Sequence, residues 1–282
     1  KNFVERGDIG ASVAVCLDGE LVVDLWAGWQ NEEESIPWVE NTLVPVWSIG
    51  KAVTAIAVLR LVDQGQISLD DRVSTYWPEF GQAGKRDVTI RMLLGHRAGL
   101  PAVEKILPES LQLTDWDAMC SALAEQTPWW TPDTGHGYHT NTIGFLLGEL
   151  VRRVTTRRIG EVIREDIANP LGAEFFVGLD EEYDDRTADW ISYKPLKDEV
   201  VPDRQPWSKI KYAEATHFQR MSIRTYGNPK TNKAHTPASR VWRSAEFPST
   251  NPHSNARSVA LIFGALANGG HGLNGYRLLS PD

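Results

Sequence analysis

The stretch WSIGKAVTAIAVLRLV, residues 47–62, decides how this sequence can fold. After Ser48 and Lys51 it is an almost unbroken run of apolar residues that ends near Gly65, which predicts a buried helix. Residues three apart on a helix lie on the same face, one turn from each other. Ser48 and Lys51 are therefore expected to meet at the first turn of this helix.

This pairing has a chemical and a structural interpretation. A serine hydroxyl becomes a good nucleophile when a neighbouring group takes its proton, and a lysine in apolar surroundings can do so because burial disfavours its charged form. Ser-x-x-Lys is a nucleophile signature of penicillin-recognising enzymes, although the spacing also occurs by chance. Alternatively, Ser48 is only a helix N-cap and Lys51 a solvated charge. A first-turn lysine opposes the helix dipole, which favours the chemical interpretation.

Composition narrows the class of protein. The 282 residues are 41% apolar and 23% charged, which predicts a soluble globular protein of one large domain or two intimate lobes. The net charge of −8 argues against a nucleic-acid partner, and no apolar run is long enough to span a membrane. Cys16 and Cys120 are predicted to be buried free thiols. With no visible signal segment, a cytoplasmic location is favoured, but the compartment stays open because the sequence does not begin with methionine.

Local patterns predict the order of the elements. Two strand-like runs, 12–17 and 21–26, are joined by Asp18-Gly19, a strong hairpin signal. A short strand at 44–47 then leads into the Ser48 helix. Between 180 and 248 the pattern dissolves into a long polar stretch, typical of a functional or covering loop region. Further helices are predicted over 90–95 with Thr89 as its cap, from a capping box at 114–117 to about 125, and over 141–154, 160–168 and 255–268.

A second group of reactive side chains lies at Tyr138-His139-Thr140, between a Pro/Gly-rich loop and an apolar helix. A phenol held beside a lysine can relay the proton of Ser48 to a leaving group. The alternative is a tyrosine that only packs at a loop–helix junction.

The histidines receive structural interpretations. His136 and His139 could bind a metal together, but no third ligand is nearby, so neither a metal nor a cofactor is expected. His139 is expected to orient Tyr138 or to line the cleft. His96 is interpreted as capping or packing at its helix end, where a cation suits the dipole.

Several segments in order resemble one known family, the serine β-lactamase superfamily of class C-like enzymes and penicillin-binding proteins. The resemblance is closest to its esterase branch, the family VIII carboxylesterases and related β-lactamase-domain proteins. It covers nearly the whole chain except residues 190–245. The segments that carry it are 10–26, Trp47-Ser48-Ile49-Gly50-Lys51, 89–101, Tyr138-His139-Thr140, 253–258 and 278–281.

The resemblance implies an α/β (α+β) fold of the β-lactamase/transpeptidase type, an antiparallel sheet flanked by helices plus a mainly helical lobe. Residues 1–75 would form the first part of the α/β domain and 76–248 the helical lobe, including the irregular segment 180–248. Residues 249–282 would return to the α/β domain. The family also places a Lys-Thr-Gly motif or its equivalent on a strand beyond 278–281. We therefore expect an incomplete sheet, with a second oxyanion donor supplied from outside these residues, and no activity from them alone.

The resemblance also implies roles for individual residues. Ser48 would be the acylated nucleophile, its backbone N–H one oxyanion donor, and Lys51 its proton partner. Tyr138 would be the general base for attack and the acid for the leaving group. Substrate contacts are expected from Trp47, His139 and Thr140.

The substrate expectation follows from a departure from the lactamase pattern. Lactamases carry Tyr-x-Asn, whereas here the third position is Thr140 and the asparagine follows at Asn141. Tyr-His-x is typical of the esterase branch, which favours a carboxylesterase acting on small or medium acyl esters. A β-lactamase or D-alanyl peptidase with the same mechanism, acting on an amide, is one alternative. A non-catalytic scaffold protein is the other. A homo-oligomer stays open.

Overall fold

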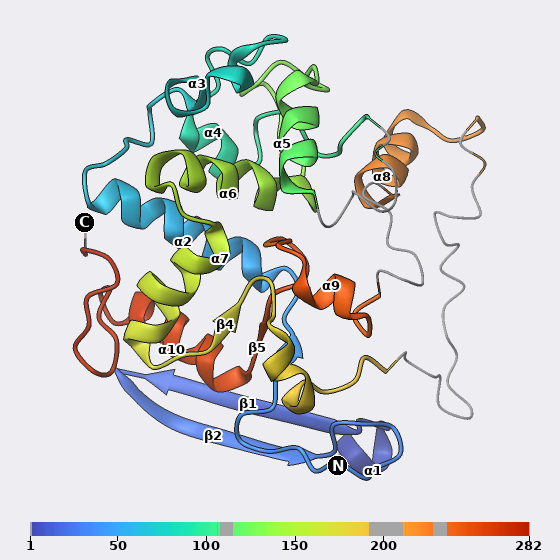
Figure 1. Cartoon of the computed structure of the whole chain (residues 1–282), viewed down its shortest axis with the longest axis vertical. Coiled ribbons are helices and arrows are strands. Elements are labelled where there is room, and N and C mark those ends of the chain that lie inside the picture. The colour runs from blue at the N-terminus through green and yellow to red at the C-terminus, as the bar shows by residue number, and fades with distance from the viewer. Residues whose placement is uncertain are drawn as a thin grey trace.

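The computed structural model describes residues 2–105, 107, 115–191, 211, 213–227 and 236–281. Figure 1 shows a hairpin of two long strands at one end, a group of helices at the other, and helix α2 running between them. The hairpin is formed by β1 (Gly10–Leu17) and β2 (Glu20–Gly28), and α2 spans Ile49–Asp63. This mixture of antiparallel strands and helices agrees with the predicted fold class.

The hairpin forms as the sequence predicts. Strands β1 and β2 pair antiparallel from Gly10↔Gly28 to Leu17↔Glu20, and both turn residues, Asp18 and Gly19, have positive φ. Helix α10 (Ala256–Ala267) packs on this hairpin, mostly on β1. The predicted helix over 255–268 is thereby confirmed.

A second, small sheet brings three distant segments together. Strand β5 (His253–Ser254) lies between β3 (Val44–Pro45) and β4 (Phe175–Phe176), and both pairings are antiparallel. Because β3 leads directly into α2, this sheet fixes the start of the Ser48 helix.

Helix α2 is buried on several sides, as its run of apolar residues predicts. Val53, Ala57 and Val58 have no exposed surface, and α2 packs against α6 (Thr142–Thr155). Helix α6 is amphipathic, and its buried first turns come directly after the Tyr138 loop. The two helices therefore bring the two groups of reactive residues to one place.

The Thr89 cap is present as predicted, whereas Asp115, not Thr114 of the predicted capping box, caps the helix that follows it. The side chains of Thr89, Asp115 and Asn255 accept hydrogen bonds from the backbone N–H groups of Met92, Ala118 and Ser258. Thr114 of the predicted capping box lies outside the described residues. The remaining helices are α1 (Asn2–Glu5), α3 (Val73–Tyr76), η1 (Pro78–Gly81), α4 (Ile90–Leu94), α5 (Trp116–Glu125), α7 (Ile159–Val162), η2 (Ile163–Ala168) and η3 (Asn169–Leu171).

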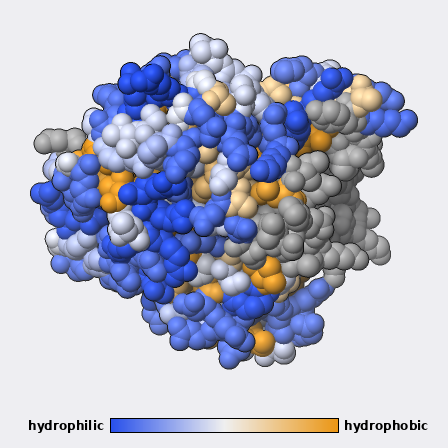
Figure 2. Space-filling model, turned by 45° about the horizontal axis from the view of Figure 1, so that its top comes forward, coloured by the Kyte–Doolittle hydropathy of each residue, from blue (hydrophilic) through white to orange (hydrophobic). Residues whose placement is uncertain are grey.

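The segment 180–248 is more regular than predicted. It contains η4 (Glu181–Arg186), α8 (His217–Gly227) and α9 (Arg240–Ser244), while much of the rest of it lies outside the described residues. Among the helices that the structure describes, length and apolar character never combine to the degree that a membrane crossing requires. The face shown in Figure 2 is largely hydrophilic, with its apolar residues in small separate patches.

The two cysteines differ in exposure. Both are free, as predicted; Cys120 is buried, whereas Cys16 is only half-buried, on the β1 strand beside Gly264 of α10. The expectation of a buried thiol is thus confirmed for Cys120 and wrong for Cys16.

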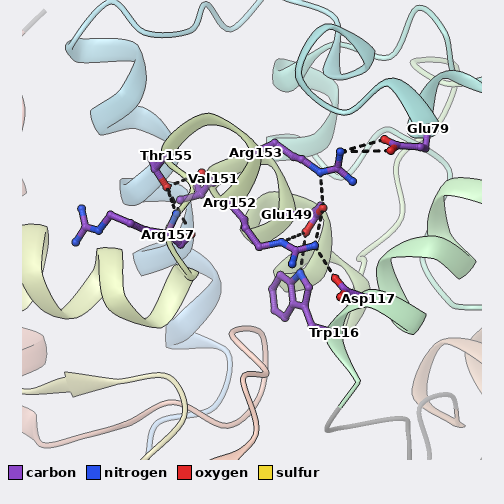
Figure 3. A network of polar contacts seen from close by, with 9 residues as sticks. All are labelled: Glu79, Trp116, Asp117, Glu149, Val151, Arg152, Arg153, Thr155 and Arg157. Atoms are coloured by element: carbon purple, nitrogen blue, oxygen red, sulfur yellow. Dashed lines mark hydrogen bonds and ion pairs between the residues drawn. The ribbon is translucent and has the colours of Figure 1, made fainter.

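An ion-pair network occupies the far part of α6 (Figure 3). Glu149 has no exposed surface and accepts hydrogen bonds from Arg152, Arg153 and the indole N–H of Trp116. The two arginines continue to Asp117 on α5 and Glu79 on η1. The network therefore ties three helical segments of the lobe together.

Candidate active site

Ser48 and Lys51 meet at the start of α2, as the spacing predicts. Lys51 Nζ donates a hydrogen bond of 2.9 Å to Ser48 Oγ. The Ser48 side chain makes no capping hydrogen bond to the helix, and Lys51 is 9% exposed. The alternative interpretation, an N-cap serine with a solvated lysine, is therefore wrong.

The surroundings of Lys51 lower the proton affinity of its amine. Apart from Ser48 Oγ, its Nζ donates to the backbone carbonyl of Ser249 at 2.7 Å, and neither partner carries a charge. Burial lowers the pKa of Lys51 to about 8. An amine with this pKa is partly neutral near pH 7 and can accept the proton of the serine.

The chain enters α2 through a strained turn at Trp47, whose φ is 49°. A bulky side chain rarely adopts this conformation, which costs about 1–3 kcal/mol. Packing holds it in place, because the Trp47 ring lies 5.1 Å from that of Trp190 and 5.7 Å from that of Trp242, centroid to centroid. The turn leaves Ser48 exposed at the helix start.

A short segment, Pro248–Pro252, passes between the first turns of α2 and α6, and we call it the strap. A Cβ on Gly50 would lie 2.1 Å from Pro248 O, and one on Gly144 would lie 2.4 Å from Ser249 Oγ. Two glycines thus permit this close approach. The fully paired Ser249 hydroxyl accepts from Gly144 N–H at 2.8 Å and donates to Asn141 O at 2.8 Å. The strap thereby fixes the carbonyl that holds Lys51.

Tyr138 joins this pair from the loop before α6. Lys51 Nζ lies 5.0 Å from the centroid of the Tyr138 ring, and the tyrosine is 43% exposed. The structure therefore brings Ser48, Lys51 and Tyr138 to one place. The three roles assigned to them from the sequence stay predictions.

The three residues predicted to contact the substrate differ in their exposure to solvent. Trp47 is 37% exposed, whereas His139 has no exposed surface. His139 Nε2 accepts from the N–H of Leu100 at 3.0 Å, and its Nδ1 lies 2.5 Å from Gly137 O, so both ring nitrogens face backbone groups. Burial lowers the pKa of His139 to about 3, so it is neutral. Thr140 is half-buried, and its buried Oγ1 finds no hydrogen-bond partner among the described residues. These positions suit His139 to orienting its neighbours.

His96 does not act as the cation that the helix dipole suggested. It lies at the end of α4, but burial, followed by the nearby His136 and Lys51, lowers its pKa to about 4. Its ring contacts those of Tyr138 and His139 at centroid distances of 5.2 and 5.4 Å. The interpretation as a cation at the helix end is therefore wrong, because the ring is neutral at ordinary pH.

A cavity of about 450 Å³ lies beside this group without including it. Its walls include Trp29, Trp38 and Trp190, and β3 forms one side of it. Trp190 also contacts Trp47, which is the residue before Ser48. Ser48 and Tyr138 are both exposed and lie outside the lining of this cavity.

Sequence reasoning missed Ser249. It lies 198 residues from Lys51, and no local pattern marks it. A weak signal was available in Gly144 and Gly148, one turn apart on the amphipathic α6, because glycine inside a helix commonly marks close packing.

Comparisons with known proteins identify the family and agree with the fold. The Beta-lactamase family matches residues 1–279. The chain is 31% identical to the esterase/beta-lactamase LipL of Mycobacterium tuberculosis, over 97% of this chain and 62% of LipL. It therefore spans less than two thirds of the length of that relative. Two crystal structures, of a family VIII carboxylesterase and of a penicillin-binding protein homologue from Caulobacter crescentus, are each 35% identical. They cover 99% of this chain and 70% of theirs, with TM-scores of 0.85 and 0.82.

Proposed function

The chain belongs to the Beta-lactamase family, and from this premise we propose that it is the catalytic part of a serine hydrolase that forms an acyl-enzyme on Ser48. The observation that carries the proposal is the 2.9 Å hydrogen bond between Lys51 Nζ and Ser48 Oγ, made by a buried lysine whose pKa is about 8. A lysine held in this way is suited to activating a hydroxyl and poorly suited to stabilising the fold.

The reaction proceeds in two halves. Ser48 Oγ attacks the carbonyl carbon of the substrate while its proton passes to the Lys51–Tyr138 pair, and the carbonyl becomes an oxyanion. Tyr138 then gives a proton to the leaving oxygen as its bond to the carbonyl carbon breaks. In the second half, water attacks the acyl carbon and loses a proton to the same pair. The bond between that carbon and Ser48 Oγ then breaks, Ser48 Oγ takes the proton from the pair, and the acid leaves.

We propose carboxylic esters of small or medium acyl groups as substrates. The Tyr138-His139-Thr140 sequence supports esters over lactams, and LipL and the esterase EstB of Burkholderia gladioli, 29% identical over 60% of this chain, are named as esterases. A β-lactamase activity is the second candidate, because the name of LipL includes it. Rates on short nitrophenyl esters and on a chromogenic cephalosporin, measured on one preparation, separate the two.

The nucleophile is tested with a fluorophosphonate probe on the full-length protein. We expect labelling of the wild type and none of Ser48→Ala. Peptide mapping should place the probe on Ser48. A wild-type protein that stays unlabelled, although folded, would overturn the proposal and favour a non-catalytic scaffold.

A further inference from the structure

His96 occupies an unusual position in the chain. It follows the last turn of α4 and has a φ of 55°, in the left-handed region that few residues other than glycine adopt. This backbone conformation accompanies a side chain that contacts the Tyr138 loop, where the ring lies 5.2 Å from the Tyr138 ring. The same conformation ends the helix, because the N–H groups of His96 and Arg97 donate to Leu93 O and Met92 O at 2.9 and 2.8 Å.

His96 holds the backbone on both sides of Tyr138. Its carbonyl oxygen accepts the N–H of Gly137 at 3.2 Å, and its Nδ1 accepts the N–H of His139 at 3.0 Å. Tyr138 is the residue between these two anchor points. A single residue therefore restrains the backbone from which the phenol projects.

The acceptor role requires a particular form of the ring. Nδ1 can accept a hydrogen bond only when it carries no proton, so a neutral His96 must hold its proton on Nε2. Burial and the neighbouring His136 and Lys51 keep the ring neutral at ordinary pH. A protonated ring would place an N–H against the N–H of His139.

A second layer of contacts supports the same loop. The N–H of Leu100 donates to His139 Nε2 at 3.0 Å, and Leu100 O accepts from Thr142 Oγ1 at 2.6 Å. Hydrogen bonds with residues 96–100 thus hold residues 137–142 in place. This explains why the two segments bear on one function although they lie about 40 residues apart.

We propose that His96 is a positioning residue, which sets the orientation of Tyr138 by accepting the backbone N–H of His139 through Nδ1. The inference rests on the proposed function, because it gives Tyr138 the work of protonating the leaving group. It adds a residue that touches no substrate and acts through the backbone.

Two substitutions separate the acceptor from the backbone conformation. Asparagine and glycine both tolerate positive φ, but only His96→Asn offers an acceptor, its Oδ1, near the position of Nδ1. We expect His96→Gly to lower kcat by roughly 10- to 100-fold on an ethyl ester, since small misplacements of a catalytic group have such effects. His96→Asn should recover most of this loss, and KM should change less than threefold.

The choice of leaving group identifies Tyr138 as the affected residue. Nitrophenolate leaves without a proton, so His96→Gly should slow hydrolysis of the matched nitrophenyl ester less than that of the ethyl ester, because Tyr138 then only helps to take the protons of Ser48 and water. In a Tyr138→Phe background, His96→Gly should add little further loss. Additive effects in the double variant would overturn the inference.

One measurement needs no variant. Ring-nitrogen NMR of the wild type at neutral pH should find His96 with its proton on Nε2, and a proton on Nδ1 would overturn the inference even if His96→Gly failed to fold. The inference and the proposed function fail in different ways. Fluorophosphonate labelling of Ser48 with equal activity in wild type and His96→Gly would refute only the role of His96.

Discussion

Two buried charges at opposite ends of the helical core have opposite surroundings. Lys51, at the start of α2, has two neutral oxygen partners, the hydroxyl of Ser48 and the carbonyl of Ser249. Glu149, on the far part of α6, receives hydrogen bonds from two arginines and a tryptophan (Figure 3). Among the described residues no counter-charge contacts Lys51, whereas Glu149 is fully paired.

The pKa values follow this difference. Burial lowers the pKa of Lys51 to about 8, because nothing charged compensates for the lost water. Burial alone raises the pKa of Glu149, yet the hydrogen bonds from Arg152, Arg153 and Trp116 bring it below its ordinary value. A poorly paired buried charge is thus available for proton transfer, whereas a well-paired one stabilises the fold.

A third buried charge, Lys85, shows that burial and a lowered pKa alone do not make a lysine a candidate for proton transfer from a serine. Lys85 has no exposed surface, donates to the Gln126 carbonyl, and its pKa is also lowered to about 8 by burial. In the part of the chain that the structure describes, its ammonium group contacts that carbonyl and the ring of Phe80, and no hydroxyl takes the place of Ser48. Lys85 is therefore a matched control for Lys51.

The largest expected effect comes from removing the lysine of the active site. Lys51→Met should lower the rate of fluorophosphonate labelling at Ser48 by about 10²- to 10⁴-fold, the usual contribution of a general base. The melting temperature should hold or rise, because a buried ammonium is replaced by an apolar chain of similar length. Lys85→Met should leave the labelling rate within twofold of wild type. Equal losses in both variants would break the comparison.

The opposite result is expected for Glu149. Glu149→Leu removes the shared partner of Arg152 and Arg153, and the free energy of unfolding should fall by about 3 kcal/mol, near the lower end for broken buried pairs because both arginines reach solvent. Urea titration measures this loss, while the labelling rate per folded molecule should stay unchanged. Glu79→Ala, which breaks only the outer ion pair, should change stability by less than about 1 kcal/mol. A slower labelling rate in Glu149→Leu would show that the network serves the site.

The sequence predicted those features whose cause is local. The hairpin follows from Asp18-Gly19, the start of α4 from the Thr89 cap, and the meeting of Ser48 with Lys51 from helical spacing. In each case the interacting groups lie within a few residues, so the pattern contains the physical reason.

The features that the sequence did not reveal depend on distant contacts. Ser249 holds Lys51 across 198 residues, and the Glu149 network joins α6 to α5 and η1. The neutral state of His96 could not be read from its place at a helix end, because it depends on burial beneath a loop some 40 residues away. Packing of this kind leaves no periodic trace in a single sequence.

Two glycines of α6, one turn apart, pack against different neighbours. Gly144→Ala would place a Cβ 2.4 Å from Ser249 Oγ, and Gly148→Ala would place one 2.6 Å from the Trp116 ring. Both should lower the free energy of unfolding by about 1–3 kcal/mol through overpacking. Gly144→Ala alone displaces the strap, so it alone should slow labelling of Ser48, by roughly tenfold. Similar labelling rates in the two folded variants would mean that the strap does not position Lys51.

The surroundings of Lys51 and of Glu149 should respond to pH in different ranges. The neutral form of Lys51 grows as the pH rises through about 8, so labelling of Ser48 should increase by about tenfold from pH 7 to a plateau above pH 9. The pKa of Glu149 is lowered, so its stabilisation is complete above the ordinary carboxyl pKa and is lost only as the pH falls through the lowered value. Labelling rates and urea midpoints measured from pH 3 to 10 follow both regions. In Lys51→Met the rise in rate near pH 8 should vanish while the acid loss of stability persists. A rise that survives in this variant would assign the titration to another group and leave Lys51 as a fixed charge.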